Sequence, residues 1–102
     1  MTSINIDTKA GTYEAQGHAG YARAGEDIVC AAVSVISDLM RWAAIMSHGE
    51  QSADGSHVST RGISENYLFM LKAAAWAAAQ LEGQYPEYVR LKMAGGKDES
   101  ES

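Results

Sequence analysis

The sequence of 102 residues holds a single cysteine, a single proline and a single phenylalanine. One cysteine cannot form a disulfide within the chain, so its thiol fits a reducing compartment, and we expect a cytoplasmic protein. The first residues, Met1–Asp7, carry neither a basic segment nor an apolar one, so we expect no signal peptide. These absences favour an ordinary intracellular domain over a disulfide-stabilised secreted one.

Basic residues are also scarce, because 8 Lys and Arg stand against 13 Asp and Glu and give a net charge of −5. No Lys/Arg cluster is present that could neutralise a row of phosphates, which argues against direct nucleic-acid binding. The alanine-rich run is broken by Lys72 and Gln80, and no stretch of about 18 uninterrupted apolar residues remains, which argues against a membrane span. An acidic surface instead favours a cationic peptide as partner.

Hydrophobic periodicity predicts seven elements. Ile4 and Ile6 alternate with polar residues, as do Tyr13 and Ala15, which is typical of two short strands paired as a hairpin. Apolar residues at helical spacing predict a first long helix from Ile28 to about Met46. Its wetter face is marked by three polar residues: Ser37, Asp38 and Arg41.

The second half of the chain repeats this strand–helix alternation. Residues 47–62 are the least patterned, but Asp54-Gly55 suggests a tight hairpin turn between two short strands. Ser64 is a good N-cap for a second helix, which runs from Asn66 to Leu81 and is stopped by Gly83 and Pro86. A last strand begins near Val89, where apolar and polar residues again alternate.

These elements predict an α+β fold in which two long helices pack on a mixed or antiparallel sheet. The predicted order is strand, strand, helix, strand, strand, helix, strand. A chain of this length has room for one hydrophobic core, so we expect a single domain over residues 1–94. Residues 95–102 are too polar to fold and are expected to form a disordered acidic tail.

The lone cysteine, Cys30, suggests a catalytic role because His18 lies twelve positions before it, where a strand should run out into a loop. A strand end and a helix start can bring a base and a thiol together, which is the minimum apparatus of a cysteine protease. With Asp27 as N-cap, Cys30 is the third helical residue, where unpaired N–H groups and the helix dipole favour a negative sulfur. The same N–H groups, including that of Cys30, are candidate donors for an oxyanion.

Other residues in this region have candidate supporting roles. Ser34 lies one helical turn after Cys30 on the same face, and either its hydroxyl or the Asp27 carboxylate can orient His18. The loop from Ala19 to Glu26 contains small residues that would allow it to close over a bound peptide. The glycines assigned to this flexible loop, together with the strand end just before it, are Gly17, Gly20 and Gly25.

Two motifs here resemble a known family. The segments Gly17–Ala22 and Gly25–Ser34, including the spacing from His18 to Cys30, are similar to the ribosomal-processing cysteine protease (Prp, YsxB-like) family. A weaker resemblance extends over roughly residues 3–93. It implies a cysteine endopeptidase that removes the N-terminal extension of a large-subunit ribosomal protein with a Cys30–His18 dyad, although some relatives could process phage capsid precursors. It also implies a closing loop and, with the broad apolar faces of both helices, a homodimer; no cofactor or metal is implied.

Less specific interpretations remain open. Composition alone favours an inert core thiol for a cysteine on an Ala/Val-rich helix, and His18 alone would be an ordinary loop residue. Asp27 can be only a helix cap, and Ser34 can bond back to a carbonyl one turn earlier. A zinc site needs His48 and His57 as further ligands, and the spacings fit no compact pattern. The alternative function is a non-catalytic peptide-binding or ribosome-associated module.

Overall fold

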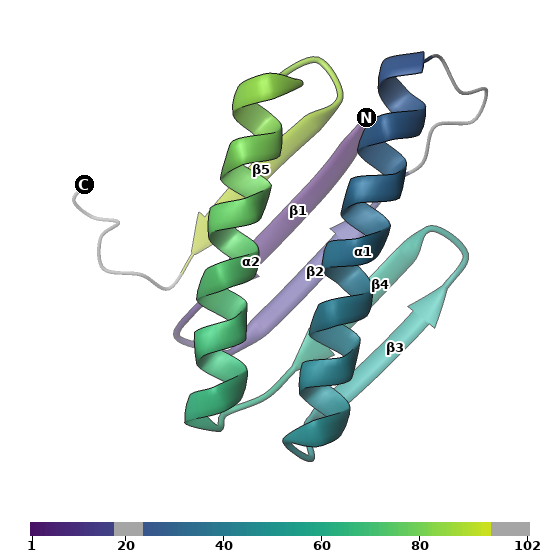
Figure 1. Cartoon of the computed structure of the whole chain (residues 1–102). Coiled ribbons are helices and arrows are strands. Elements are labelled where there is room, and N and C mark those ends of the chain that lie inside the picture. The colour runs from purple at the N-terminus through teal and green to yellow at the C-terminus, as the bar shows by residue number, and fades with distance from the viewer. Residues whose placement is uncertain (18–23, 95–102) are drawn as a thin grey trace.

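The computed structural model describes residues 1–17 and 24–94, including side chains for all of these except residues 24–27. The predicted acidic tail, residues 95–102, lies outside the described part of the chain. The element order confirms the predicted α+β fold (Figure 1). The elements are β1 (Thr2–Asp7), β2 (Thr12–Gln16), α1 (Ala24–Met46), β3 (Glu50–Asp54), β4 (His57–Arg61), α2 (Glu65–Gln84) and β5 (Val89–Ala94).

The five strands form one mixed sheet in the order β3-β4-β2-β1-β5. Its neighbours pair antiparallel except for β1 and β5, which run parallel. The predicted hairpin in the middle segment is present, with Asp54 paired to His57. Gly55 supplies the positive φ of 60°, while Asp54 belongs to β3 rather than to the turn.

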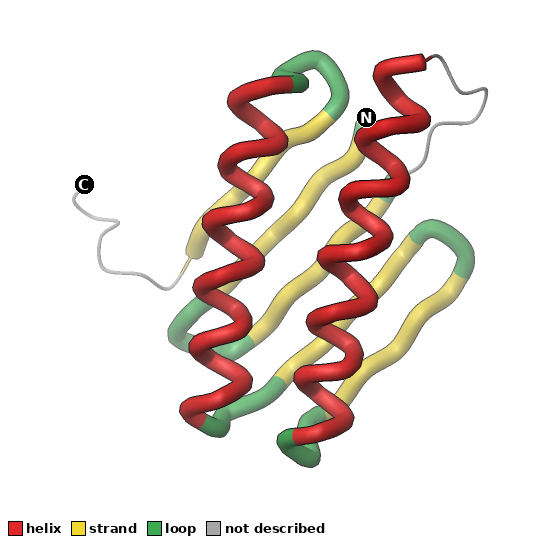
Figure 2. The backbone as a smooth tube through the Cα atoms, in the orientation of Figure 1, coloured by secondary structure: helices red, strands yellow, loops and turns green. Residues whose placement is uncertain are grey.

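Both helices cover the same face of the sheet (Figures 1 and 2). Alternate residues of the central strands point into this layer and are fully buried or nearly so, as the period of two requires: Ile4, Ile6, Tyr13 and Ala15. The intervening residues of β1 and β2 are polar and lie on the uncovered face. The hydrophobic core therefore lies between one face of the sheet and the two helices.

Helix α1 begins at Ala24, four residues before the predicted start, and ends at Met46 as predicted. The prediction treated Gly25 as part of a loop and Asp27 as the N-cap, whereas both are residues of α1. An earlier start has a physical reason, since Ala24 is a good helix former. Glu26 and Asp27 in the first turn also complement the positive end of the helix dipole.

Helix α2 begins where the sequence predicts. The Ser64 side chain accepts a hydrogen bond of 3.0 Å from the backbone N–H of Tyr67, which confirms Ser64 as the N-cap. The helix continues through Gly83 to Gln84, slightly beyond the predicted end at Leu81. Its buried face alternates large and small side chains, which allows close packing against the sheet and α1: Tyr67, Leu71, Ala74 and Ala78.

One segment of α1, Ile28–Met46, has a mean hydropathy of 1.7 over 19 residues and is long and apolar enough to cross a membrane. Polar residues including Ser37, Asp38 and Arg41 interrupt this segment, so it is not one of the uninterrupted apolar stretches on which the sequence prediction was based. Length and composition do not separate a membrane span from a core helix. Here one side of the segment, including Val29, Val33 and Met40, is buried inside the domain.

Candidate active site

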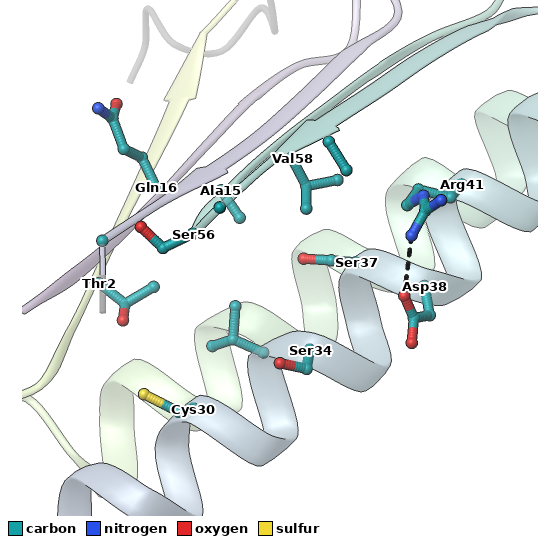
Figure 3. Close-up of a pocket in the computed structure, with 14 residues that line it drawn as sticks. Thr2, Ala15, Gln16, Cys30, Ser34, Ser37, Asp38, Arg41, Ser56 and Val58 are labelled. Atoms are coloured by element: carbon teal, nitrogen blue, oxygen red, sulfur yellow. Dashed lines mark ion pairs between the residues drawn. The ribbon is translucent and has the colours of Figure 1, made fainter. Parts of the chain in front are cut away.

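A groove with a volume of about 440 Å³ lies between the middle of α1 and the sheet. Its sheet side is formed by the start of β1, the end of β2 and the turn between β3 and β4 (Figure 3). Apolar side chains contribute to its lining: Ala15, Val33, Ala53 and Val58. The groove is open to solvent, so its lining is accessible from outside the domain.

The helical wall of the groove is a polar stripe along α1, formed by Cys30, Ser34, Ser37, Asp38 and Arg41. Their spacings of three and four residues place all five on one side of the helix, as Figure 3 shows. The Cys30 thiol is free and partly exposed at the end of the stripe nearest the helix start. A nucleophile at this position is accessible to whatever lies in the groove.

The end of β2 approaches the groove through Gln16 and Gly17. Gly17 has a φ of 118°, and a Cβ atom there would lie 2.4 Å from the Met1 carbonyl oxygen. Only glycine satisfies both conditions, so the chain leaves the sheet close to β1 and beside the groove. Thr2 and Ser56 are further polar residues on the sheet side of the groove.

The structure brings together three of the predicted site residues, since Cys30, Ser34 and Gly17 line the same groove. His18 and Gly20 lie outside the described residues. Asp27 and Gly25 belong to the backbone of α1, so Gly25 is part of a helix and Asp27 is not its N-cap.

Because α1 begins earlier than predicted, Cys30 lies farther from the N-terminus of the helix than expected. Cys30 is the seventh residue of the helix instead of the third. The helical pattern pairs its N–H with the Glu26 carbonyl, and the effect of the dipole falls off within the first turn. The predicted oxyanion contact from the Cys30 N–H therefore requires that this helical bond be given up.

A buried hydrogen bond of 2.8 Å joins Tyr13 Oη to Ser37 Oγ at the base of the groove. Tyr13 is fully buried and Ser37 is 3% exposed. Burial raises the pKa of Tyr13 to about 12, against a smaller lowering by the hydrogen bond to Ser37. Ser37 was predicted to share a wetter face with Asp38 and Arg41. The side chains of Asp38 and Arg41 are 73% and 39% exposed, as expected, whereas Ser37 is buried against the sheet.

At the far end of the groove, Arg41 bridges α1 and β3. Its Nε donates a hydrogen bond of 3.0 Å to Gln51 Oε1, and its Nη1 lies 3.6 Å from Asp38 Oδ1. Both contacts are at the surface, where an ion pair contributes at most about 1 kcal/mol. The polar stripe was visible in the sequence as Cys30, Ser34 and three polar residues at helical spacing, but its role as a groove wall was missed.

The zinc hypothesis is not supported by the geometry. His57 Nε2 lies 2.7 Å from Glu14 Oε2 on the uncovered face of the sheet, whereas Cys30 lies on the helical side. Within residues 1–17 and 28–94, no three His, Cys, Asp or Glu side chains are grouped so that they could hold a metal ion.

The family model for cysteine protease Prp matches residues 1–90 of the chain. Two crystal structures of the essential ribosomal processing protease Prp from S. aureus share the fold. One contains a covalently linked product peptide and has a TM-score of 0.77 at 24% identity; the other contains a substrate peptide and has a TM-score of 0.79 at 23% identity. Each comparison covers 91% of this chain and 99% of that one.

The crystal structure of SMU.848 from Streptococcus mutans is also similar, with a TM-score of 0.69 and 25% identity over 91% of each chain. No curated protein sequence matches the chain. The family match covers most of the polypeptide, including all the strands and the helix that line the groove.

Proposed function

Because this chain belongs to the cysteine protease Prp family and is thus a peptidase, we propose that it is an endopeptidase with Cys30 as nucleophile and His18 as base. The observation that carries the proposal is that Cys30 lines the same groove as Gly17, the residue immediately before His18. Strand β2 thus ends at the groove just before His18, and helix α1 carries Cys30 in the wall of the same groove.

In the proposed reaction His18 takes the proton from Cys30 Sγ, and the sulfur attacks the carbonyl carbon of the scissile peptide bond. The C–N bond then breaks, the amine leaves with the proton from His18, and a thioester remains on Cys30. Water, deprotonated by His18, hydrolyses the thioester and regenerates the thiol. No cofactor takes part in any of these steps.

Ser34 and Asp27 are proposed as supporting residues. Ser34 follows Cys30 by one turn and lines the groove, so its hydroxyl is placed to contact substrate or His18. We expect Ser34→Ala to lower kcat/KM about fivefold to tenfold with unchanged stability. Asp27→Asn tests whether the Asp27 carboxylate orients His18 instead. If Ser34→Ala leaves the kinetics unchanged, Ser34 has no part in the mechanism.

The proposed substrate is the N-terminal extension of a large-subunit ribosomal protein. The S. aureus proteins with the same fold are ribosomal processing proteases, and one of them binds a substrate peptide. The net charge of −5 would attract a cationic precursor at low salt. A groove that is open to solvent can admit an extended terminus.

The first experiment measures the rate of Cys30 alkylation by iodoacetamide against pH, in the intact protein and in His18→Ala. The dyad predicts fast labelling near neutral pH that slows, or shifts to higher pH, without His18. Slow labelling with the same profile in both proteins would overturn the dyad. The Glu14→Gln variant, which changes the partner of His57 on the uncovered face, is the control and should label like the intact protein.

The second experiment tests the substrate. Precursors of large-subunit ribosomal proteins and of a phage capsid protein are incubated with the enzyme, and the products are sequenced by mass spectrometry. We expect one cut near the N-terminus of a ribosomal precursor and none with Cys30→Ala, which should still bind. A cut only in the capsid precursor would move the proposal to that substrate. Binding without cutting by the intact protein would favour the non-catalytic module.

We also propose a homodimer formed through the outer face of the helices. Large apolar side chains on this face are more than half exposed, namely Val35, Trp42, Phe69 and Trp76. An apolar groove lined by Leu39, Met70 and Ala77 runs between α1 and α2, and a second copy can bury these side chains in its own groove. Sedimentation should show a dimer for the intact protein and for Ser52→Glu, and a monomer for Trp42→Glu. A monomeric intact protein would exclude this interface.

The proposed location is the cytoplasm, where a free catalytic thiol stays reduced. Cell fractionation with antibodies tests it, and enrichment in the membrane fraction would contradict it and favour a membrane role for the apolar segment of α1.

A further inference from the structure

Two buried tyrosine hydroxyls tie the helices to the sheet. Tyr13 of β2 is hydrogen-bonded to Ser37 of α1, and Tyr67 of α2 is hydrogen-bonded to Thr60 of β4, both at 2.8 Å. Tyr13 and Thr60 are directly paired across β2 and β4, so the two bonds lie side by side in the core. All four side chains are almost completely buried.

The first of these bonds joins the two elements of the proposed site. Strand β2 leads through Gly17 to His18, and α1 carries Cys30. Within the described part of the chain, the side-chain hydrogen bonds from α1 to the sheet are the buried bond to Tyr13 and the exposed bond from Arg41 to Gln51. The remaining contacts of α1 with the core are apolar, and such contacts are not directional.

Helical geometry transmits the position of Ser37 to Cys30. Ser37 follows Cys30 by seven residues, which is about two turns of an α-helix. The directions of their two side chains therefore differ by only about 20° around the helix axis. Figure 3 shows both side chains projecting from α1 in the same direction. A hydrogen bond that fixes Ser37 against the sheet therefore also fixes the direction of the thiol.

A small displacement of the Cys30 sulfur should lower the catalytic rate strongly. With a helix radius of about 5 Å including side chains, a rotation of about 20° moves the sulfur by roughly 2 Å. A misplacement of about 1 Å can lower a rate by about 10²-fold. The close-packed apolar side chains of α1 also resist such a rotation, and the hydrogen bond adds a directional constraint to them.

We propose that Tyr13 is a positioning residue, which sets the rotation of α1 so that the Cys30 thiol faces the groove beside the end of β2. This inference rests on the proposed function for its kinetic consequence, but the orientation of the thiol can be measured without a substrate. The Thr60–Tyr67 bond is the matched control, because it has the same chemistry and burial and joins two elements that carry neither His18 nor Cys30.

The experiment compares Tyr13→Phe with Tyr67→Phe. Each removes one hydroxyl and leaves one buried hydroxyl without its partner, so both should lose comparable stability in urea unfolding. In folded protein we expect Tyr13→Phe to lower kcat at least tenfold with KM changed less than threefold, and to slow Cys30 alkylation at least fivefold. Tyr67→Phe should stay within twofold in all three measurements. Equal kinetics in the two variants would overturn the proposal.

A double variant separates positioning from stability. Tyr13→Phe combined with Ser37→Ala removes both polar groups, so stability should recover in part, whereas kcat and the alkylation rate should stay low. Recovery of the rates together with stability would mean that the bond is only structural. If Tyr13→Phe fails to fold, Ser37→Ala alone replaces it with the same expected kinetics.

The outcomes also separate this inference from the proposed function. An intact protein that cuts no precursor contradicts the proposed function, while the alkylation rates still decide whether Tyr13 positions the thiol. An intact protein that cuts normally, with Tyr13→Phe and Tyr67→Phe alike in kcat and labelling, contradicts the positioning role alone.

Discussion

The two helices lie on the same face of the sheet and are each tied to it by a tyrosine hydroxyl, yet they differ in what surrounds that bond. Around α2 the buried side chains are Tyr67, Leu71, Ala74 and Ala78, which fill the core. Around α1 the bond borders a groove lined by the polar stripe and the free thiol. Both helices therefore pack in the core, but the α1 bond, unlike the α2 bond, lies beside the groove that contains the thiol.

This difference suggests a division of roles. Substitutions on the α2 side should lower the free energy of unfolding and leave the activity of each folded molecule unchanged. Substitutions beside the groove should lower activity more than their effect on stability explains. Four predictions test this division, beginning with the largest expected effect.

Gly62→Ala should cost about 3 kcal/mol of stability. A Cβ atom at Gly62 would lie 2.6 Å from the ring of Tyr67, which is fully buried and bonded to Thr60 and so cannot move aside. Urea unfolding measures the loss. Gly83→Ala is the control, because a Cβ there meets nothing within 4 Å, and we expect it to gain up to about 1 kcal/mol. An unchanged midpoint for Gly62→Ala would show that the α2 side is loosely packed.

Alkaline pH should weaken the α1 attachment through Tyr13. Its folded-state pKa is raised from 10.0 to about 12, so the unfolded chain loses this proton first and stability falls as pH rises from about 10 to 12. A shift of this size corresponds to a loss of about 2–3 kcal/mol. The pKa of Tyr67 is also raised by burial, so it contributes in the same direction.

The check is urea unfolding at pH 9 and at pH 11.5 in the intact protein, Tyr13→Phe and Tyr67→Phe. Tyr13→Phe should show the smaller decline with pH, because the phenol responsible is gone. If both variants decline as steeply as the intact protein, the phenols of Tyr13 and Tyr67 are not the cause of the decline.

The sequence predicted the fold well because most of its signals are local. Alternation around Ile4 and Tyr13 and the N-cap at Ser64 each depend on a few neighbouring residues, and the structure confirms the elements they predict. The candidate site was predicted in part, since Cys30 and Ser34 share the groove with Gly17.

The sequence did not show what each face contacts. Helical spacing grouped Ser37 with Asp38 and Arg41, but periodicity cannot distinguish a face directed at solvent from one directed at a groove in the sheet. Burial of Ser37 depends on its partner Tyr13, which is 24 residues away. The start of α1 was missed for a different reason, because Gly25 was weighed as a loop residue although Ala24 and the acidic residues after it favour a helix.

Gly17→Ala should lower activity more than its effect on stability explains, the opposite of the result expected for Gly62→Ala. The substitution strains a φ of 118° and places Cβ 2.4 Å from the Met1 carbonyl oxygen. Relief of this strain shifts the backbone at the end of β2, and we expect a cost of about 1–2 kcal/mol. The same shift redirects the chain before His18 and should lower kcat/KM about tenfold or more.

Gly11→Ala is the matched control for Gly17→Ala. It combines a φ of 73° with a Cβ only 2.1 Å from the Gly62 carbonyl oxygen, away from the groove. We expect a larger loss of stability and normal kinetics per folded molecule, with active sites counted by titration of the thiol. Normal kinetics for Gly17→Ala as well would mean that the exit from β2 does not position the base.

Ser64→Ala should have the smallest effect, a loss of about 1 kcal/mol, because it removes the side chain that accepts from the Tyr67 N–H. The cap lies on the α2 side and lines no part of the active-site groove, so kcat/KM per folded molecule should stay within error. Ser64→Asp keeps an acceptor at the N-terminus of α2 and should retain nearly all of the stability. A fall in kcat/KM for Ser64→Ala that Ser64→Asp restores would show that α2 influences the thiol through the shared core. The proposed division of roles between the helices would then be wrong, because a substitution on the α2 side would change activity as well as stability.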